Sequence, residues 1–128
     1  MATPDERRKK LGALGERIAE DYLRRQKYVI RERNFRCSIG EIDLVAVERD
    51  TLVLVEVRTR QGSRFGTAKE SVATRKQEKL VQLAELYLQS HPTDLPKCRI
   101  DVVAVEFAPD GRLLSVELIR NAVEGRGY

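Results

Sequence analysis

The chain has 128 residues, of which 34% are charged and 41% hydrophobic, with a formal net charge of +4. This length and balance predict one globular domain with a single core, without the composition of a disordered chain. No apolar run reaches the roughly 18 residues of a membrane span, and the charged N-terminus lacks the apolar stretch of a secretory signal. We therefore expect a cytoplasmic protein with no membrane partner, and two cysteines and one histidine exclude a disulfide framework or a zinc site.

The first half of the chain changes from a helical period to a strand period. Residues 5–26 carry one apolar stripe among Arg, Lys and Glu, which is typical of an amphipathic helix. Apolar residues then recur at every second position over residues 28–35, 39–47 and 51–59. The turns between these segments are short, so we predict three strands that are antiparallel neighbours.

A second helix and two further strands follow. A basic, glycine-containing loop is expected at residues 60–66, and apolar residues return to helical spacing over 67–90. Two prolines end this helix. Residues 98–107 are apolar on both faces, which indicates an internal strand, and residues 112–119 form the last strand.

The resulting order, αβββαββ, predicts one α/β domain. We expect it to span residues 1–120, followed by a flexible C-terminal tail at 121–128. The sequence is compatible with a homodimer but does not decide the oligomeric state.

Two of the predicted strands carry carboxylates among their apolar residues. A two-residue turn at 49–50 would place Asp43 opposite Glu56 and Glu41 opposite Arg58, all on one face. Opposed carboxylates, with Cβ atoms about 5 Å apart, repel each other, and a divalent cation would relieve this. The alternative is a solvated face with a Glu41–Arg58 ion pair. The opposite face is apolar and is expected to pack on a helix: Ile42, Leu44, Ala46, Val53, Val55 and Val57.

A third carboxylate is available from the first helix. At about 100° per residue, Glu16 falls at the margin of the buried stripe, whereas Glu20 falls further round and is expected to face water. Together with Asp43 and Glu56, Glu16 would supply hard oxygen ligands of the kind that hold Mg²⁺ or Mn²⁺.

These residues carry a resemblance to known proteins. The segments "GEIDL" and "LVEVR" resemble the Asp and Glu-x-Lys elements of the PD-(D/E)xK endonuclease-like superfamily. The fuller pattern resembles the YraN-like family of bacterial proteins, through Gly15, Glu16, "RNFR" at 33–36, "GEIDLVAV", "VEVRTR", "FG" at 65–66, Lys76 and "CRIDVVAV" at 98–105. The resemblance implies a mixed central sheet flanked by helices, as in restriction endonucleases and Holliday-junction resolvases.

The resemblance also implies roles for individual residues. Asp43 and Glu56 would be the metal ligands, with Mg²⁺ or Mn²⁺ as cofactor, and Glu16 an auxiliary carboxylate. Arg58 stands where the superfamily pattern has lysine. Arginine keeps the positive charge but cannot lose a proton, so this replacement is not conservative.

Lys76 is an unexpected charge on the apolar stripe of the second helix. Its ammonium group either extends along the helix surface to water or reaches a cleft, where it would supply the flexible cation that Arg58 cannot be.

Further basic residues surround these strands. Arg33, Arg36, Arg60, Arg64 and Lys69 are placed to contact a phosphate backbone, and the alternative is a solvated basic loop. Aromatic residues make up only 5%, which disfavours stacking on single strands and favours duplex or branched DNA. We therefore predict a metal-dependent nuclease acting on DNA, with a non-catalytic nucleic-acid-binding or protein-interaction module of the same fold as the alternative.

Overall fold

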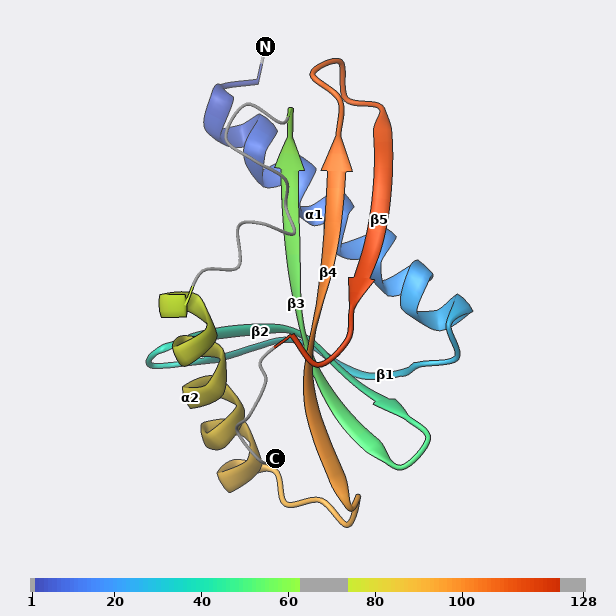
Figure 1. Cartoon of the computed structure of the whole chain (residues 1–128). Coiled ribbons are helices and arrows are strands. Elements are labelled where there is room, and N and C mark those ends of the chain that lie inside the picture. The colour runs from blue at the N-terminus through green and yellow to red at the C-terminus, as the bar shows by residue number, and fades with distance from the viewer. Residues whose placement is uncertain (1, 63–73, 123–128) are drawn as a thin grey trace.

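The structure, a computed structural model, describes residues 2–62 and 74–122, with side chains described from residue 78 onward in the second segment (Figure 1). The elements are α1 (Pro4–Arg25), β1 (Val29–Cys37), β2 (Gly40–Glu48), β3 (Thr51–Gln61), α2 (Thr74–Ser90), β4 (Lys97–Phe107) and β5 (Leu113–Ile119). Their order confirms the predicted single α/β domain.

All five strands form one mixed sheet in the order β1-β2-β3-β4-β5. Neighbouring strands are antiparallel, except that β3 and β4 are parallel and are connected through α2. The strand β4 is internal, as its apolar sequence on both faces predicts. Figure 1 shows α1 crossing one face of the sheet and α2 lying on the other, which confirms a mixed sheet flanked by helices.

The helix α1 begins and ends where local signals place it. The Thr3 side chain accepts a hydrogen bond of 3.1 Å from the Glu6 amide, and Pro4 occupies the first turn, where its missing N–H costs nothing. Two arginines in the last turn complement the partial negative charge at the helix C-terminus. These features hold the whole predicted helix in place, shifted by one residue at each end.

The core consists of two apolar clusters, one on each face of the sheet. Val53 and Val55 of β3 pack in the α1 cluster with Ala19 and Leu23, whereas Leu52 and Leu54 pack in the α2 cluster. The alternation of β3 therefore divides its side chains between the two helices.

One predicted member of the α1 face lies elsewhere. Leu44, Ala46 and the three valines of β3 pack with α1 as expected, but Ile42 belongs to the α2 cluster. The pairing of β2 with β3 ends at Leu44↔Val55. Beyond that pair, β2 is no longer held in register with β3, so the predicted face does not extend to Ile42.

Strand β3 is longer than predicted. It extends to Gln61, which pairs with Phe107 of β4, and the Gly62 amide donates to the Phe107 carbonyl at 2.8 Å. Arg60 therefore belongs to a strand and not to the loop predicted from residue 60. Residues 67–73, the predicted beginning of the second helix, lie outside the described residues.

The chain after β5 is bonded back to β4. The Asn121 amide donates to Asp101 Oδ1 at 2.9 Å, and the Ala122 amide donates to the Ile100 carbonyl at 2.8 Å. Residues 123–128 lie outside the described residues, so a flexible tail there stays a prediction.

A polar network joins β2 and β4 to the residues just before β1 and just after β5. Asp101 is fully buried and accepts hydrogen bonds from Tyr28 at 2.8 Å and from Arg99 at 2.8 Å. Arg99 and Arg120 both bind Glu48, at the end of β2. Buried charges paired in this way are strongly coupled, because the loss of one leaves another without its partner.

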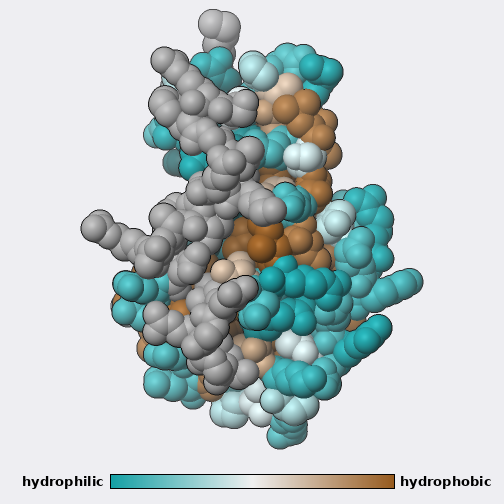
Figure 2. Space-filling view, in the orientation of Figure 1, coloured by the Kyte–Doolittle hydropathy of each residue, from teal (hydrophilic) through white to brown (hydrophobic). Residues whose placement is uncertain are grey.

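Most of the surface in the view of Figure 2 is hydrophilic, with apolar surface gathered over β4 and β5. Leu113 and Leu114 of β5 are among the exposed large hydrophobic residues. No helix among the described residues is long and apolar enough to cross a membrane. The homodimer stays a prediction.

Candidate active site

A glycine brings α1 close to β3. Gly15 is buried, and a Cβ atom at this position would collide with the side chain of Thr59. This close approach places the next residue, Glu16, at a cavity of about 330 Å³ beside β3. Val57, Arg58 and Arg60 also line this cavity. The helix and the strand thus present one carboxylate, that of Glu16, and two guanidinium groups, those of Arg58 and Arg60, to the same cavity.

The second acidic residue is positioned by the separation of two strands. The predicted register of β2 and β3 is confirmed from Glu48↔Thr51 to Leu44↔Val55, where the pairing ends. Asp43 comes next in β2, and its Oδ2 accepts a hydrogen bond of 2.7 Å from the Val57 amide. The Asp43 carboxylate thus accepts the hydrogen bond that a backbone carbonyl of a neighbouring strand would otherwise accept from Val57.

This separation corrects two predicted pairs. Asp43 is not a ladder partner of Glu56, and the predicted Glu41–Arg58 ion pair is absent, since those residues lie beyond the last paired position. Arg58 instead binds Glu56 of its own strand at 3.0 Å, and Glu41 binds Arg36 at 3.1 Å. The two carboxylates at positions 41 and 56 therefore each have an arginine partner.

Four carboxylates interact electrostatically across α1, β2 and β3: Glu16, Glu41, Asp43 and Glu56, here called the acidic cluster. The pKa of Asp43 is raised to about 7, chiefly by burial; the hydrogen bond from the Val57 amide lowers it, and the other three carboxylates contribute to the rise. Burial, together with Glu41, also raises the pKa of Glu16, which Arg36 opposes. Such a site favours a proton or a cation near Asp43.

The donor set of the acidic cluster suits a hard divalent cation, because all its ligands would be carboxylate oxygens. Of the two carboxylate oxygens of Asp43, Oδ2 accepts a hydrogen bond and Oδ1 accepts none from the described residues. Oδ1 is therefore available to a cation. In the part of the chain that the structure describes, no three His, Cys, Asp or Glu side chains are yet arranged as a metal site. Metal binding would therefore require side chains of the cluster to converge.

Arg58 is the most enclosed basic group of the site. Its side chain is 20% exposed and lies between the cavity beside α1 and a second cavity of about 250 Å³ beside α2. The buried Nε of Arg58 has no hydrogen-bond acceptor among the described residues. An unsatisfied buried donor lowers the stability of the folded state by about 1–3 kcal/mol. Other interactions in the fold must offset this loss.

The second cavity contains a lysine that the sequence reasoning did not select. Lys79 of α2 lines it together with Glu41, Glu56 and Arg58. The Lys79 Cε lies 3.1 Å from the position that a Cβ would occupy on Gly40. A signal was available, because Lys79 stands one helical turn before the buried Leu83 and so shares its face. The side chain of Lys76, the predicted lysine, lies outside the described residues.

Comparison with known proteins places this chain in a family. A family model described as "Uncharacterised protein family UPF0102" matches residues 15–105, most of the chain. The chain belongs to this family. It is 47% identical to the UPF0102 protein of Symbiobacterium thermophilum over 89% of this chain and 96% of the relative. It is also 44% identical to the UPF0102 protein of Moorella thermoacetica over 90% of this chain and 96% of the relative.

Membership of UPF0102 confirms the predicted YraN-like family. The matched residues 15–105 include every member of the acidic cluster, as well as Arg58 and Lys79. The N-terminal half of α1 lies outside the match. The names of these UPF0102 relatives state no activity, so the chemistry of the site follows from its residues alone.

The basic residues predicted to contact phosphates have different surroundings in this UPF0102 protein. Arg33 is held by Glu20 at 2.7 Å, and Arg36 by Glu41 at 3.1 Å. The side chain of Glu20 is only 16% exposed, so the expectation that it faces water is wrong. Arg60 lines the cavities beside α1 and is exposed. The predicted contacts Arg64 and Lys69 lie outside the described residues.

Proposed function

We propose that this UPF0102 protein is a metal-dependent phosphodiesterase that acts on nucleic acid, with structured or duplex DNA as the favoured substrate. The observation that supports this most is the acidic cluster, in which the pKa of Asp43 is raised to about 7 while Arg58 stands beside Glu56. Carboxylates that repel one another next to a fixed positive charge suit a cation and a phosphate together.

The residues divide into three roles. Asp43 and Glu56 would hold Mg²⁺ or Mn²⁺, with Glu16 as the auxiliary carboxylate. Such a cation, when bound, lowers the pKa of a bound water and polarises a phosphoryl oxygen. Glu56 would have to exchange part of its contact with Arg58, which is 3.0 Å away, for the cation.

Arg58 and Lys79 would stabilise negative charge on the phosphate. The guanidinium of Arg58 is a fixed charge that cannot act as a base. Lys79 is exposed, with a flexible side chain that reaches the same cavity, so its ammonium could approach the phosphate or the attacking water. Lys79 would thereby supply what position 58 lacks in this chain.

One observation favours a second candidate function. Arg58 already neutralises Glu56, and the carboxylates are not arranged as a metal site among the described residues. A non-catalytic nucleic-acid-binding or protein-interaction module of the same fold would be compatible with this arrangement.

A metal titration followed by thermal unfolding tests the proposed site. A ligand that binds only the native state raises its melting temperature, so Mn²⁺ should stabilise the wild type. Asp43→Asn should abolish this response while the metal-free protein keeps its stability or gains slightly. Asp21→Asn, an exposed residue of α1 with the same charge change, is the control. An unchanged metal response in Asp43→Asn would remove Asp43 from the ligand set.

Cleavage is tested separately with Mn²⁺ on single-stranded, duplex, flap and four-way DNA and on matching RNAs. The proposal expects a product from at least one substrate in the wild type and none in Asp43→Asn. Binding without cleavage of any substrate would favour the non-catalytic module.

A further inference from the structure

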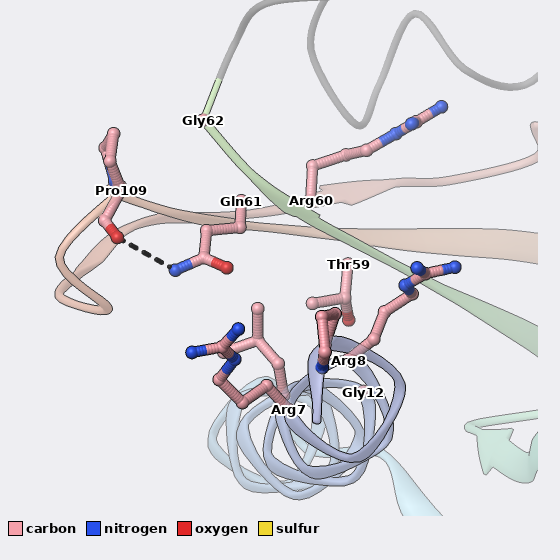
Figure 3. Close-up of a pocket in the computed structure, with 10 residues that line it drawn as sticks. Arg7, Arg8, Gly12, Thr59, Arg60, Gln61, Gly62 and Pro109 are labelled. Atoms are coloured by element: carbon pink, nitrogen blue, oxygen red, sulfur yellow. Dashed lines mark hydrogen bonds between the residues drawn. The ribbon is translucent and has the colours of Figure 1, made fainter. Parts of the chain in front are cut away.

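A groove lies between the first turns of α1 and the end of β3, and it encloses about 820 Å³ (Figure 3). Its lining includes Arg7 and Arg8 from α1 and Arg60 from β3. In Figure 3, Arg8 and Arg60 extend in the same direction while Arg7 points to the other side of the groove. We propose that this groove, here called the arginine groove, binds the phosphodiester backbone of a nucleic-acid strand. This inference rests on the proposed function and specifies where the nucleic-acid strand would bind.

The charge of the groove is not neutralised from within, because none of the described residues that line it is acidic. Among the described residues, the one ion pair of its arginines joins Arg8 to Asp5 at 3.8 Å, with both side chains more than three-quarters exposed. Exposed pairs of this kind contribute little. Arg33 and Arg36, by contrast, are each held close to a carboxylate. The groove therefore presents three positive charges to an anion.

The floor of the groove leaves room for a chain to pass. Gly12 lies where α1 faces β3, and a Cβ added there would have no heavy atom within 4 Å. Thr59 is the small β3 residue that lines the groove near Arg60. Gln61 is held aside by a hydrogen bond of 3.1 Å from its amide to the Pro109 carbonyl (Figure 3). The arginines consequently border an open space and not a packed surface.

The arginine groove leads to the acidic cluster. Gly12, Thr59 and Arg60 line both this groove and the adjoining cavity that contains Glu16 and Arg58. Arg8 and Glu16 are 16 − 8 = 8 residues apart on α1, which corresponds to about 12 Å along the helix axis. Each strand of B-DNA carries one phosphate per roughly 3.4 Å of axis. A strand with one phosphodiester at the acidic cluster would thus place phosphates about three to four positions away near Arg8.

Recognition of this kind does not depend on base sequence. Arginine contacts to phosphates determine position and affinity, whereas base edges are needed for sequence reading. Of the described side chains that line the groove, those of its arginines alone are charged. The ligand class is therefore the sugar-phosphate backbone itself.

Two matched triple variants test the groove in metal-free buffer with a chelator, where no cleavage is needed. The groove variant carries Arg7→Gln, Arg8→Gln and Arg60→Gln. The control carries Arg25→Gln, Arg31→Gln and Arg49→Gln, all exposed, with Arg25 and Arg49 at the opposite ends of α1 and β3 from the groove. Both lose the same charge. Thermal unfolding verifies that each variant is folded.

Binding to a short labelled DNA duplex is measured by fluorescence anisotropy over a series of salt concentrations. The groove variant should lose on the order of tenfold or more in affinity, and its slope of log affinity against log salt should flatten by about 2–3, at roughly 0.9 per lost phosphate contact. A second duplex of different sequence should give the same losses. The control variant should change both quantities much less.

Three results would overturn the inference: equal losses in both triple variants, no loss in the groove variant, or no binding of the wild type to the duplex. The outcome is independent of the metal site. Asp43→Asn should bind the duplex in chelator at least as tightly as the wild type, because it removes a negative charge beside the bound strand. A failed metal response with an intact groove effect would refute the proposed catalysis but not the groove.

Discussion

At the scale of single residues, the environment of Asp43 is unusual for a carboxylate in a strand. Its Oδ2 accepts the Val57 amide, a contact that lowers a carboxyl pKa, yet burial and three neighbouring acids raise that pKa from its ordinary value of 3.8 to about 7. The folded protein therefore pays a cost for ionising this group. A cost of this kind within a cluster of carboxylates is more typical of a functional position than of a purely structural one.

The pH dependence of stability should report this cost. A carboxyl whose folded pKa is raised stabilises the fold when protonated, so its contribution is full below pH 3.8 and is lost as the pH rises through about 7. In chelator, urea unfolding of the wild type should show a loss of about 3 kcal/mol attributable to Asp43 between pH 4 and pH 7. Asp43→Asn should remove this component, and the same slope in both proteins would contradict the assignment.

Substitutions at position 58 test whether the protein is an active nuclease. Arg58→Lys should retain any cleavage, because an ammonium keeps the charge and can approach water more closely, whereas Arg58→Ala should abolish it. Lys79→Ala should reduce cleavage if that lysine shares the role. Lys97→Ala, which removes an exposed lysine paired with Asp50 at 3.7 Å, is the control and should leave cleavage unchanged. Full activity in Lys79→Ala would exclude Lys79 from the mechanism.

At the scale of elements, the packing of α1 on β3 depends on one glycine. Gly15 allows a contact with Thr59 that any side chain would block, and this contact determines how close Glu16 lies to the acidic cluster. Gly12 of the same helix has open space around its Cβ position. Close packing against β3 therefore requires a glycine at position 15 but not at position 12.

Alanine substitutions at the two positions should have opposite effects on the stability of the protein. Gly15→Ala should destabilise the protein by about 1–3 kcal/mol, since it forces the helix away from the strand, and should weaken any metal response. Gly12→Ala should stabilise it by about 0.5–1 kcal/mol, because alanine has the better helix propensity. Urea unfolding measures both. Equal effects would show that the helix–strand contact adapts to a side chain at position 15.

At the scale of the whole molecule, the acidic cluster and the buried network lie at opposite ends of β2. Asp43 stands near the beginning of that strand and Glu48 at its end. The network around Asp101 joins β2 and β4 to Tyr28, just before β1, and to the residues after β5, whereas the site draws on α1, β2, β3 and α2. The network contains charges that are paired, whereas the acidic cluster contains charges that repel one another.

Asp101→Asn should show how much the network stabilises. The substitution removes a fully buried charge that Arg99 and Tyr28 both contact, so we expect a loss of about 3 kcal/mol in the free energy of unfolding. Asp110→Asn breaks an ion pair with Arg112 whose side chains are 60% and 74% exposed, and it should cost less than about 1 kcal/mol. Similar losses in both variants would contradict the assignment of the network as a stabilising unit.

Patterns along the sequence predict the seven elements, the paired part of the β2–β3 register and the family. Alternation, helical period and a two-residue turn are local properties, and the pairs from Leu44↔Val55 to Glu48↔Thr51 follow from them. The candidate residues Glu16, Asp43 and Glu56 could be chosen for the same reason, as acids at positions where apolar residues are expected.

How these residues meet depends on contacts that exist only in the folded chain. The ladder ends before Asp43 because its carboxylate takes the Val57 amide, and Arg58 consequently binds Glu56 in place of the predicted Glu41. Lys79 reaches the site through the packing of α2, and Arg7 and Arg8 line the same groove as Arg60 because α1 lies across the end of β3. These contacts join residues far apart in the chain, so no period or spacing along the sequence encodes them directly.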